Sequence, residues 1–532
     1  MTLPAWLRWS WVLPAAFLAV FLAYPLATLV RTIASSAGGF AADLVDTSLW
    51  QVAGLAVLQA LASTLLALLI GLPLANVATR YRYRGRALVQ ALVTVPFVLP
   101  TVVVALAVRS LLGPGMPQGL ALVVIAHAYV NLAVVTRIVG SQWAQQTGEL
   151  ELVARTLGAS RWRAFVDVTL PGLRPSIITS AAVVFVFSFS SLGIVLLLGD
   201  ATTRTLESQV LRQVSVLLDF PGAAASAIVQ LVVVSLVLLL GAVASRGQSS
   251  RRRRPVPLHP LPTLPGPRLA VLGTAAFGSA IVLLPIIALV LASLRGPAGW
   301  TLDWWASLGS VDAGTTRLAP PSAALATSLG YAAVTALVAA LVGGAAALAI
   351  LVPGRARVIA VIGMVPLGVS AATLGLGTLL AFGRPPFDLR GTGLLVPVAH
   401  ALVAVPLVIA VVTPALRGTD PRLAALAATL GARASRAFWT AHGPVLRVAM
   451  VASAALAGAV SLGEFGAAAF LARTDSPTVP VQIVRLLGRP GDQSVGVAAA
   501  LAVVLVVVTL LLVLLIDRWG STRTSRRSAV AA

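Results

Sequence analysis

The sequence predicts an all-α membrane protein with about twelve transmembrane helices, arranged in two six-helix halves. Three observations support this fold class. The 532 residues are 58% hydrophobic and only 10% charged, whereas a soluble domain is nearer a quarter charged. Apolar runs of about 20 residues, enough to cross a bilayer core of roughly 30 Å, recur along the chain. Residues of the first half of the chain also recur in the second half at a constant offset.

The apolar runs form two sets of six. The first run lacks a convincing cleavage site and is too long for a typical signal-peptide core, so we interpret it as a retained helix. An even number of spans places both termini on the same side of the membrane. The first set lies near 11–33, 50–78, 88–112, 119–140, 176–199 and 223–245, and the second near 269–293, 323–352, 358–382, 393–416, 449–472 and 493–516.

Arginine clusters set the orientation of these spans. The clusters lie at 80–86, 251–254 and 523–527, all of them in segments that the span order places on one side. Positive residues favour the cytosolic side, so we expect a multi-pass plasma (inner) membrane protein with both termini cytosolic. The same rule explains the net charge of +22 and gives no reason to expect nucleic acid as a partner.

We predict four parts along the chain. The first half covers 1–245, an Arg/Pro-rich cytosolic linker covers 246–268, the second half covers 269–517, and a cytosolic tail covers 518–532. The linker shows no helical periodicity. Its arginine run either contacts anionic membrane lipid or is simply a stop-transfer and topology signal, and we favour the second interpretation.

The two halves share a register of matched residues. Gly158 is matched by Gly431 and Pro171 by Pro444, at the same offset. Chance does not explain an offset kept over some ninety residues. Two halves with six spans each have the same orientation, which predicts a pseudo-two-fold axis along the membrane normal with a pathway between the halves. Further pairs at this offset are His127 with His400, Ser188 with Ser461, Gly193 with Gly466, and Gln209 with Gln482.

Two polar, arginine-bearing segments interrupt the apolar pattern, each between the fourth and fifth spans of its half. We name them the first loop segment (145–175) and the second loop segment (418–448). In the first, the pattern predicts a short helix over 149–156, a glycine turn over 157–160, and a second helix over 161–168 that Pro171 ends. Apolar residues at helical spacing form one face of the first short helix in each segment. They are Leu150, Val153, Ala154 and Leu157, and Leu423, Leu426, Ala427 and Leu430.

An apolar ridge on a polar segment needs either a groove in a partner or a site on the protein's own helix ends. The two loop segments resemble the coupling loop of ABC importer permeases. The family pattern is Glu-Ala-Ala, Gly after three more residues, and a closing Ile-x-Leu-Pro. This chain has Leu152-Val153-Ala154 with Gly158 and Pro171, and the second copy matches it with Gly431 and Pro444. The family glutamate is absent: Glu151 stands one position early in the first copy, and the second copy has no acid nearer than Asp420.

The resemblance implies a type I ABC importer permease fold and several partners. Two cytosolic ABC ATPase subunits would bind the loop segments, and an extracytoplasmic solute-binding protein would dock on the outer loops at 200–222 and 473–492. The fused layout, VVIAHAYVNLA at 123–133 and SLGEFGAAAFL at 461–471 are similar to the thiamine and ferric-iron branch, which implies thiamine or ferric iron as the solute. The implied ATPase-coupling residues are Glu151, Val153, Ala154, Leu157, Gly158, Pro171, Leu426, Ala427, Leu430, Gly431 and Pro444.

Four residues are candidates for the substrate path: Ser188, Ser191, Ser461 and Glu464. A carboxylate in a span must face a cavity or a partner, so Glu464 either favours a cationic solute or pairs with an arginine such as Arg473. The small hydroxyl residues either line the path or let helices approach closely. His127 and His400 either relay protons or, as we favour, make structural contacts in the helix bundle.

The sequence contains no catalytic apparatus. It has no cysteine, no phosphate-binding GxxxxGK[ST] loop and no metal-ligand cluster, so we expect no bound cofactor or metal and no enzymatic activity. ATP would be used by the partner ATPase. The alternative is a secondary, ion-coupled transporter with two six-helix halves, which would need several acids within its spans. A structural membrane protein is a third class that composition leaves open.

Overall fold

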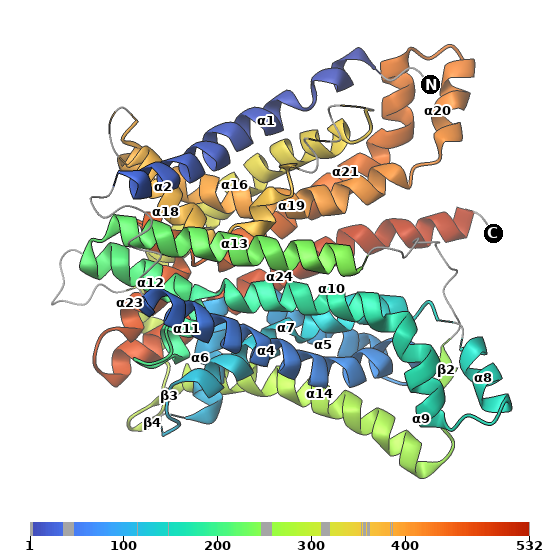
Figure 1. Ribbon diagram of the computed structural model, residues 1–532, viewed down its shortest axis with the longest axis horizontal. Coiled ribbons are helices and arrows are strands. Elements are labelled where there is room, and N and C mark those ends of the chain that lie inside the picture. Colours follow the sequence, from blue (N-terminus) through green and yellow to red (C-terminus); the bar gives the residue numbers. More distant parts are fainter. Residues whose placement is uncertain are drawn as a thin grey trace. The chain divides into compact units, whose positions relative to one another are not determined.

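The computed structural model describes residues 4–35, 47–113, 115–146, 148–245, 258–309, 320–352, 354, 358, 362–383, 385 and 387–530. These residues are overwhelmingly helical (Figure 1). The strands of the described part are two residues long: β1 (Tyr81–Arg82) pairs with β2 (His259–Pro260) in parallel, and β3 (Arg295–Gly296) pairs with β4 (Gly299–Trp300) in antiparallel. The predicted arginine run at 251–254 lies outside the described residues.

Ten helices in the described residues are long and apolar enough to cross a membrane, and one bent pair adds an eleventh if it is a single span. This confirms an all-helical membrane protein, and ten or eleven of the about twelve expected spans are found among the described residues. The first four of these helices are Ala5–Ala34, α4 (Thr47–Arg80), α7 (Leu120–Trp143) and Arg161–Phe189; the others are α13 (Phe220–Ala244), α14 (Pro265–Ala292), α16 (Pro321–Ala349), α19 (Leu395–Arg417), α21 (Ala434–Gly463) and Asp492–Leu514.

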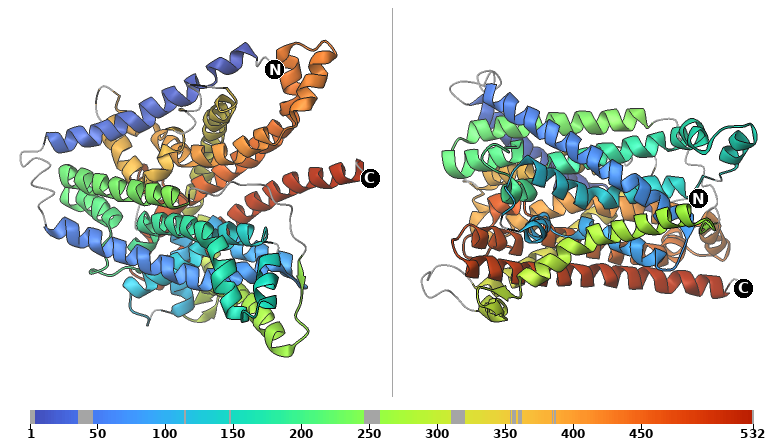
Figure 2. Two further views of the ribbon diagram at one scale, coloured as in Figure 1. Left: turned by 45° about the vertical axis from the view of Figure 1, so that its right-hand side comes forward. Right: turned by 90° about the horizontal axis from the view of Figure 1, so that it is seen from below.

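Two of these helices contain shorter elements, and short helices connect the spans. Ala5–Ala34 comprises η1 (Ala5–Trp9), α1 (Val12–Leu18), η2 (Ala19–Ala23) and α2 (Tyr24–Ala34), and Arg161–Phe189 comprises α9 (Arg161–Ala164), η3 (Phe165–Thr169) and α10 (Leu170–Phe189). The last span belongs to α24 (Asp492–Val530), a helix of 39 residues that takes in most of the predicted tail (Figure 2). The connecting helices are α8 (Glu149–Thr156), α11 (Leu192–Leu198), α12 (Leu206–Arg212), η4 (Gln213–Leu217), α15 (Asp303–Ala306), η5 (Ser307–Gly309), η6 (Val365–Gly368), η7 (Leu389–Thr392), α20 (Pro421–Thr429), α22 (Ala468–Leu471) and α23 (Val479–Leu487).

The predicted spans at 88–112 and 358–382 are not single straight helices. The first is split into α5 (Arg86–Val98) and α6 (Thr101–Leu112), which meet at an angle of 111°. Pro100 causes the break, because a proline disfavours helical geometry at the residue before it, and Leu99 is extended. The second is represented by α18 (Ala371–Phe382), which at 12 residues is only about 18 Å long. Part of its predicted range lies outside the described residues.

The chain forms two compact units. The first span of the first sequence half belongs to the unit that holds most of the second half, and the first span of the second half belongs to the unit that holds most of the first half. One unit comprises Asp46–Gln209 and Ile228–Ala292, and the other comprises Met1–Val45, Val210–Ala227 and Ser293–Ala532. In the former unit α14 packs on α4, α5 and α6; in the latter α1 packs on α16 and α2 packs on α18. The two sequence halves, 1–245 and 269–517, do not coincide with the compact units. They remain a prediction that rests on the sequence repeat.

Equivalent close helix crossings occur in the two units. A Cβ added to Gly71 in α4 would lie 2.8 Å from Val135 in α7, and one added to Gly343 in α16 would lie 2.7 Å from Val408 in α19. Glycine at each crossing lets the two backbones approach closely. Val135 and Val408 keep the offset of the sequence repeat, and Gly71 and Gly343 miss it by one position, so the repeat has a close counterpart in helix packing.

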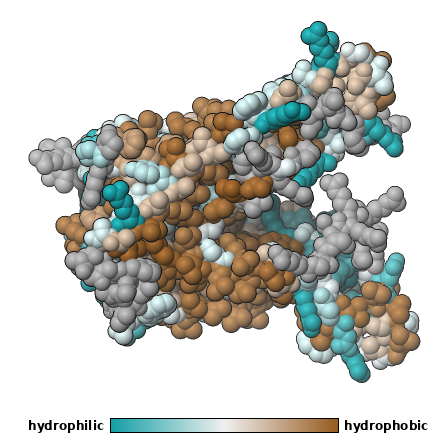
Figure 3. Space-filling view, turned by 45° about the horizontal axis from the view of Figure 1, so that its top comes forward, coloured by the Kyte–Doolittle hydropathy of each residue, from teal (hydrophilic) through white to brown (hydrophobic). Residues whose placement is uncertain are grey.

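The surface between the helix ends is apolar. The face shown in Figure 3 is coloured mostly hydrophobic, with hydrophilic residues gathered toward the ends. Leu65 and Leu69 of α4 are examples, since both are exposed although they lie in the middle of a span. A soluble monomer rarely exposes so large an apolar area, whereas lipid accommodates it.

Candidate functional site

The first loop segment has the helix, turn and helix that the sequence predicts. Its helix α8 ends in a glycine turn: Ala159 N–H donates to Ala154 O at 3.0 Å, and Gly158 N–H donates to Arg155 O at 3.1 Å. Gly158 has a φ of +92°. This pair of bonds with a left-handed glycine is a Schellman motif, which satisfies the last carbonyls of a helix. The next helix begins after Ser160, whose hydroxyl accepts a hydrogen bond from Arg163 N–H.

The second loop segment repeats this geometry. Helix α20 begins after its N-cap residue Asp420, whose carboxylate accepts a hydrogen bond from Arg422 N–H at 2.9 Å. It ends with Ala432 N–H donating to Ala427 O, and with Gly431 at a φ of +83°. The repeated glycine therefore forms a Schellman turn at the matched position of each loop segment.

Each turn presents a leucine to solvent. Leu157 is 84% exposed and Leu430 is 87% exposed. Leu150, Val153 and Leu426 beside them are also exposed. The predicted ridge therefore does not pack on the protein's own helix ends in this structure. Ala154 and Ala427 are half-buried at the inner side of the same helices.

The prolines of the loop segments do not end helices, which corrects the sequence-based prediction. Arg161–Phe189 is a continuous helix of 29 residues that includes Pro171, and Pro444 lies inside α21. In the first case a π-helical turn, η3, ends at Thr169, two residues before the proline. The wider turn accommodates a ring that would otherwise clash with the carbonyl four residues earlier. Each loop segment therefore runs without interruption into a span.

Glu151 is held by its own chain. Its Oε2 lies 3.9 Å from Arg80 Nη2 at the end of α4 and accepts a hydrogen bond of 3.3 Å from the Thr169 hydroxyl. In the second loop segment the matched position is Ala424, which is buried. The two copies therefore share backbone geometry and differ in this charge.

The fifth spans are broken where the candidate path residues lie. Helix α10 ends at Phe189, Ser190 and Ser191 are not helical, and α11 follows. A Cβ added to Gly193 would lie 2.7 Å from the Thr101 hydroxyl, so this break lies against the break between α5 and α6. Ser191 is buried, and its hydroxyl has no hydrogen-bond partner in the described part of the chain.

The other unit has the matching break. Helix α21 ends at Gly463, and Glu464 is extended. A Cβ added to Gly466 would lie 3.1 Å from the backbone nitrogen of Ala372, at the start of α18. Glu464 is half-buried, and its Oε1 accepts a hydrogen bond from Ala467 N–H at 3.2 Å. Non-helical backbone at membrane depth is tolerated only where protein buries it or a water-filled cavity adjoins it.

The matched histidines lie in buried polar clusters beside these breaks. His127 Nδ1 is 2.6 Å from Gln59 Nε2, and His400 Nδ1 is 2.8 Å from the Ser461 hydroxyl. Ser461 also donates to the Thr335 hydroxyl at 3.2 Å, while Ser188 accepts from Asn131 Nδ2 at 3.3 Å. These contacts join neighbouring helices through Ser188, Ser461 and both histidines.

Comparisons with known proteins bear on this arrangement. The family described as "Binding-protein-dependent transport system inner membrane component" matches residues 67–249. The molybdate/tungstate transport system permease protein WtpB of Thermococcus kodakarensis is 33% identical over 181 residues, covering 34% of this chain and 73% of that protein. The sulfate transport system permease protein CysT of Escherichia coli is 30% identical over 238 residues, covering 42% and 86%. The chain belongs to this family of ABC importer permeases.

The permease is also similar to a relative over nearly its full length. The thiamine transport system permease protein ThiP of Brucella abortus is 28% identical over 521 residues, which cover 93% of each chain. This alignment and the family match confirm the recognised ABC importer family and its fused two-half type. The chain is thus a multi-pass inner-membrane permease component of a binding-protein-dependent importer. It is not itself an ATPase; in this family ATP is used by a separate subunit.

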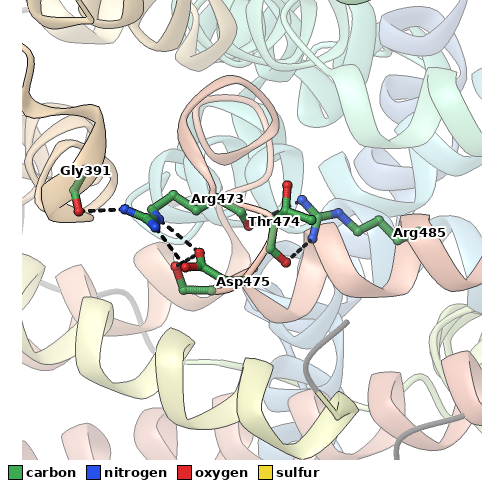
Figure 4. A network of polar contacts seen from close by, with 6 residues as sticks. Gly391, Arg473, Thr474, Asp475 and Arg485 are labelled. Atoms are coloured by element: carbon green, nitrogen blue, oxygen red, sulfur yellow. Dashed lines mark hydrogen bonds and ion pairs between the residues drawn. The ribbon is translucent and has the colours of Figure 1, made fainter. Parts of the chain in front are cut away.

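A charged network organises the loop of the permease between α22 and α23 (Figure 4). Arg473 pairs with Asp475 at 2.8 Å and donates to Gly391 O, while Arg485 donates to the carbonyls of Arg473 and Thr474. The paired Asp475 raises the pKa of Arg473 above its ordinary value, and the paired Arg473 lowers that of Asp475. Arg473 is therefore engaged with Asp475, and among the described residues no ion pair joins it to Glu464.

The matched loop of the other unit contains Asp200. Its Oδ1 accepts hydrogen bonds from the hydroxyls and backbone N–H groups of Thr202 and Thr203. These bonds lower the pKa of the carboxyl to about 2. Pockets of about 360 Å³ and 710 Å³ adjoin Asp200 and Arg473 respectively. The sequence offered no signal for these pockets beyond the mixed charge of the loops.

Proposed function

We propose that this permease imports a small solute, thiamine in the first instance, across the plasma membrane. In this proposal two cytosolic ABC ATPase subunits bind the two loop segments, and both termini lie on that side. An extracytoplasmic binding protein delivers the solute to the loops around Asp200 and Arg473.

The observation that carries the ATPase-binding proposal is the pair of exposed leucines, Leu157 and Leu430. An exposed leucine on an ordered turn leaves on the order of 1.5–3 kcal/mol of burial energy unused. The two turns have the same geometry at matched positions in the repeat, as two copies of one partner require. Helical ridges of this kind bind in grooves on partner proteins.

Helix continuity supports a mechanism. The helix Arg161–Phe189 runs from the first loop segment to the break at Ser190–Ser191, and α21 runs from the second loop segment to Glu464. Helices of 29 and 30 residues are about 44 Å long and act as stiff levers. ATPase closure would then move the path residues directly. The ATPases drive transport by binding one conformation of the permease better than the other.

The solute assignment is supported by Glu464 and by the extent of the ThiP alignment. A half-buried carboxylate at the broken span favours a cationic solute, and ThiP aligns over both halves. The second candidate is an oxyanion, because the named relatives WtpB and CysT carry molybdate/tungstate and sulfate in their names. None of these names supports ferric iron.

Serine variants test ATPase binding. Leu157→Ser and Leu430→Ser remove the apolar turn without changing the backbone requirement, whereas Leu264→Ser changes a leucine of 61% exposure outside both loop segments. The double loop variant is expected to retain less than a tenth of the ATPase in co-purification, with normal membrane levels. Leu264→Ser should behave like the unmodified chain. Full ATPase retention by the double variant would refute the proposal.

Uptake by the reconstituted importer tests the solute. The permease, its ATPase and its binding protein in proteoliposomes should take up labelled thiamine in an ATP-dependent manner. Molybdate and sulfate should not compete. Uptake of an oxyanion with no uptake of thiamine would reject thiamine and favour the second candidate.

A further inference from the structure

The N-terminal end of the first span contacts the second loop segment. Trp6, in η1, stacks on Trp439 with ring centroids 5.7 Å apart and planes 12° apart. The same ring meets Phe438 edge-on at 5.7 Å and 87°. Leu7, beside it, is buried. The N-terminal end of the chain is therefore packed against the base of a segment more than 400 positions away, as the views of Figure 2 also show.

Phe438 is well placed to fix the second loop segment. It is fully buried in the first turns of α21, a few residues after the Schellman glycine, and stacks on His442 with centroids 4.5 Å apart. Aromatic pairs of this kind contribute about 0.5–1.5 kcal/mol beyond the area they bury. Trp6 completes a cluster of four rings, with Phe438, Trp439 and His442, at the start of α21.

The other unit has a comparable contact made from polar groups. The segment before α14 pairs with the end of α4 through β1 and β2, in the register Tyr81 with His259. Arg80 Nη2 lies 3.2 Å from His259 Nε2 and 3.9 Å from Glu151 Oε2. Arg80 therefore links this segment to α8 of the first loop segment. The ring of Tyr81 also lies 6.3 Å from the ring of His259.

Each of these two contacts joins the start of one sequence half to the loop segment of the other half, and in this sense the contacts are crossed. Residues 4–9 lie at the start of the first span of the first half and contact the loop segment of the second half. Residues 258–260 precede the first span of the second half and contact, through Arg80, the loop segment of the first. The crossing follows from the exchange of first spans between the compact units.

The loop segments need such contacts because they have little core of their own. Helix α8 contains no buried residue, and in α20 the alanine at position 424 is buried while its leucines are exposed. A short helix without buried apolar contacts is only marginally stable. Its orientation must therefore come from side-chain contacts at its base.

We propose that residues 4–9 and 258–260 are braces, and that Trp6, Arg80 and His259 are positioning residues that hold each loop segment in the orientation its partner binds. The role in partner binding rests on the proposed function; the bracing itself does not. A brace also connects each loop segment to the first span of the opposite half, so a displaced loop segment displaces that span with it.

Hydrogen exchange of the full-length permease in lipid nanodiscs, without any ATPase, tests the bracing. Trp6→Ala is expected to accelerate amide exchange over 420–442 by about 2- to 13-fold, the range for loss of an aromatic pair, and to leave 149–165 unchanged. Arg80→Gln is expected to accelerate exchange over 149–165 and to leave 420–442 unchanged. Trp6→Phe should retain most of the protection, since it keeps an aromatic ring.

Trp9→Ala is the matched control, because Trp9 is in the same short helix and is 71% exposed. It should change exchange in neither segment. The proposal is overturned if Trp6→Ala behaves like Trp9→Ala. It is also overturned if Trp6→Ala and Arg80→Gln each accelerate exchange uniformly in both segments, since the crossed assignment requires two separate responses.

ATPase capture separates this proposal from the proposed function. If Trp6→Ala loosens 420–442 and also weakens ATPase capture, both proposals are supported. If exchange responds as expected while ATPase capture is unchanged, the brace stands and the ATPase-binding role of the second loop segment fails.

Discussion

Replacement of Gly431 by alanine tests how much the Schellman turn contributes to partner binding. Gly431 has a φ of +83°, and a Cβ placed there would meet nothing within 4 Å. The substitution therefore adds no clash. Its cost is that of the left-handed backbone for a residue with a side chain, about 1–2 kcal/mol. This cost corresponds to a factor of about 5–30 in the population of the turn.

The expected result is a 5- to 30-fold weaker affinity of the permease for its ATPase, because only the ordered turn presents Leu430. Affinity is measured by titrating the purified ATPase onto nanodisc-bound permease. Gly431→Asn should lose less, since asparagine visits the left-handed region more readily. Gly266→Ala is the control: its Cβ also meets open space, and its φ is outside the left-handed region. An unchanged affinity of Gly431→Ala would refute the reasoning.

Three further results are expected. Burial lowers the pKa of His259 below its ordinary value of 6.5, the charge of Arg80 lowers it further, and Glu151 opposes this shift. The neutral His259 ring accepts the hydrogen bond from Arg80, and protonation of the ring would break that bond. Acidification from about pH 7.5 to pH 5.5 should therefore accelerate hydrogen exchange over residues 149–165, while a rise in pH should leave their exchange unchanged. Gly71→Val should destabilise the permease by about 1–3 kcal/mol in thermal unfolding, because the added atoms overpack the crossing of α4 and α7. Glu464→Gln should lower thiamine uptake at least tenfold with normal membrane levels.

Each of these results has a control. His259→Gln should abolish the acid-induced change, and a change that persists would assign it to another group. Gly54→Ala, where a Cβ meets open space in the same helix, should not destabilise the permease; an equal loss in both glycine variants would exclude overpacking. Normal uptake by Glu464→Gln would remove this carboxylate from the path.

Local features of the loop segments were predictable from the sequence. The bounds of α8, the glycine turn and the exposed apolar face follow from helical periodicity and from a glycine that no other residue replaces without strain. The same signals recur in the second copy, so a repeat of the whole helix-turn-helix could be predicted without a structure.

The breaks and the helix continuity were not predictable from hydropathy. The hydropathy of an apolar run is the same whether the run forms one straight helix or two helices with a sharp bend between them. The run at 88–112 forms two helices that meet at 111°. Pro100 breaks its helix, while Pro171 is accommodated by a π turn. Which outcome occurs depends on the helices packed alongside, and no local pattern contains that information.

The braces were not predictable for a different reason. Trp6 and His259 belong to no repeat and no helical face; one is in a short 3-10 helix and the other in a two-residue strand. Their partners are distant in sequence. Only the tertiary arrangement of the first spans brings them to the loop segments.

The exchange of first spans has a consequence for biosynthesis. The helices that cover Ala5–Ala34, which are α16 and α18, leave the ribosome about 290 residues or more after it, which at 5–20 residues per second takes roughly 15–60 s. During that interval the newly inserted helix has lipid, or a membrane chaperone, as its only neighbour on those faces. A chain truncated before α16 would therefore leave its N-terminal helix orphaned in the bilayer and open to quality-control proteolysis.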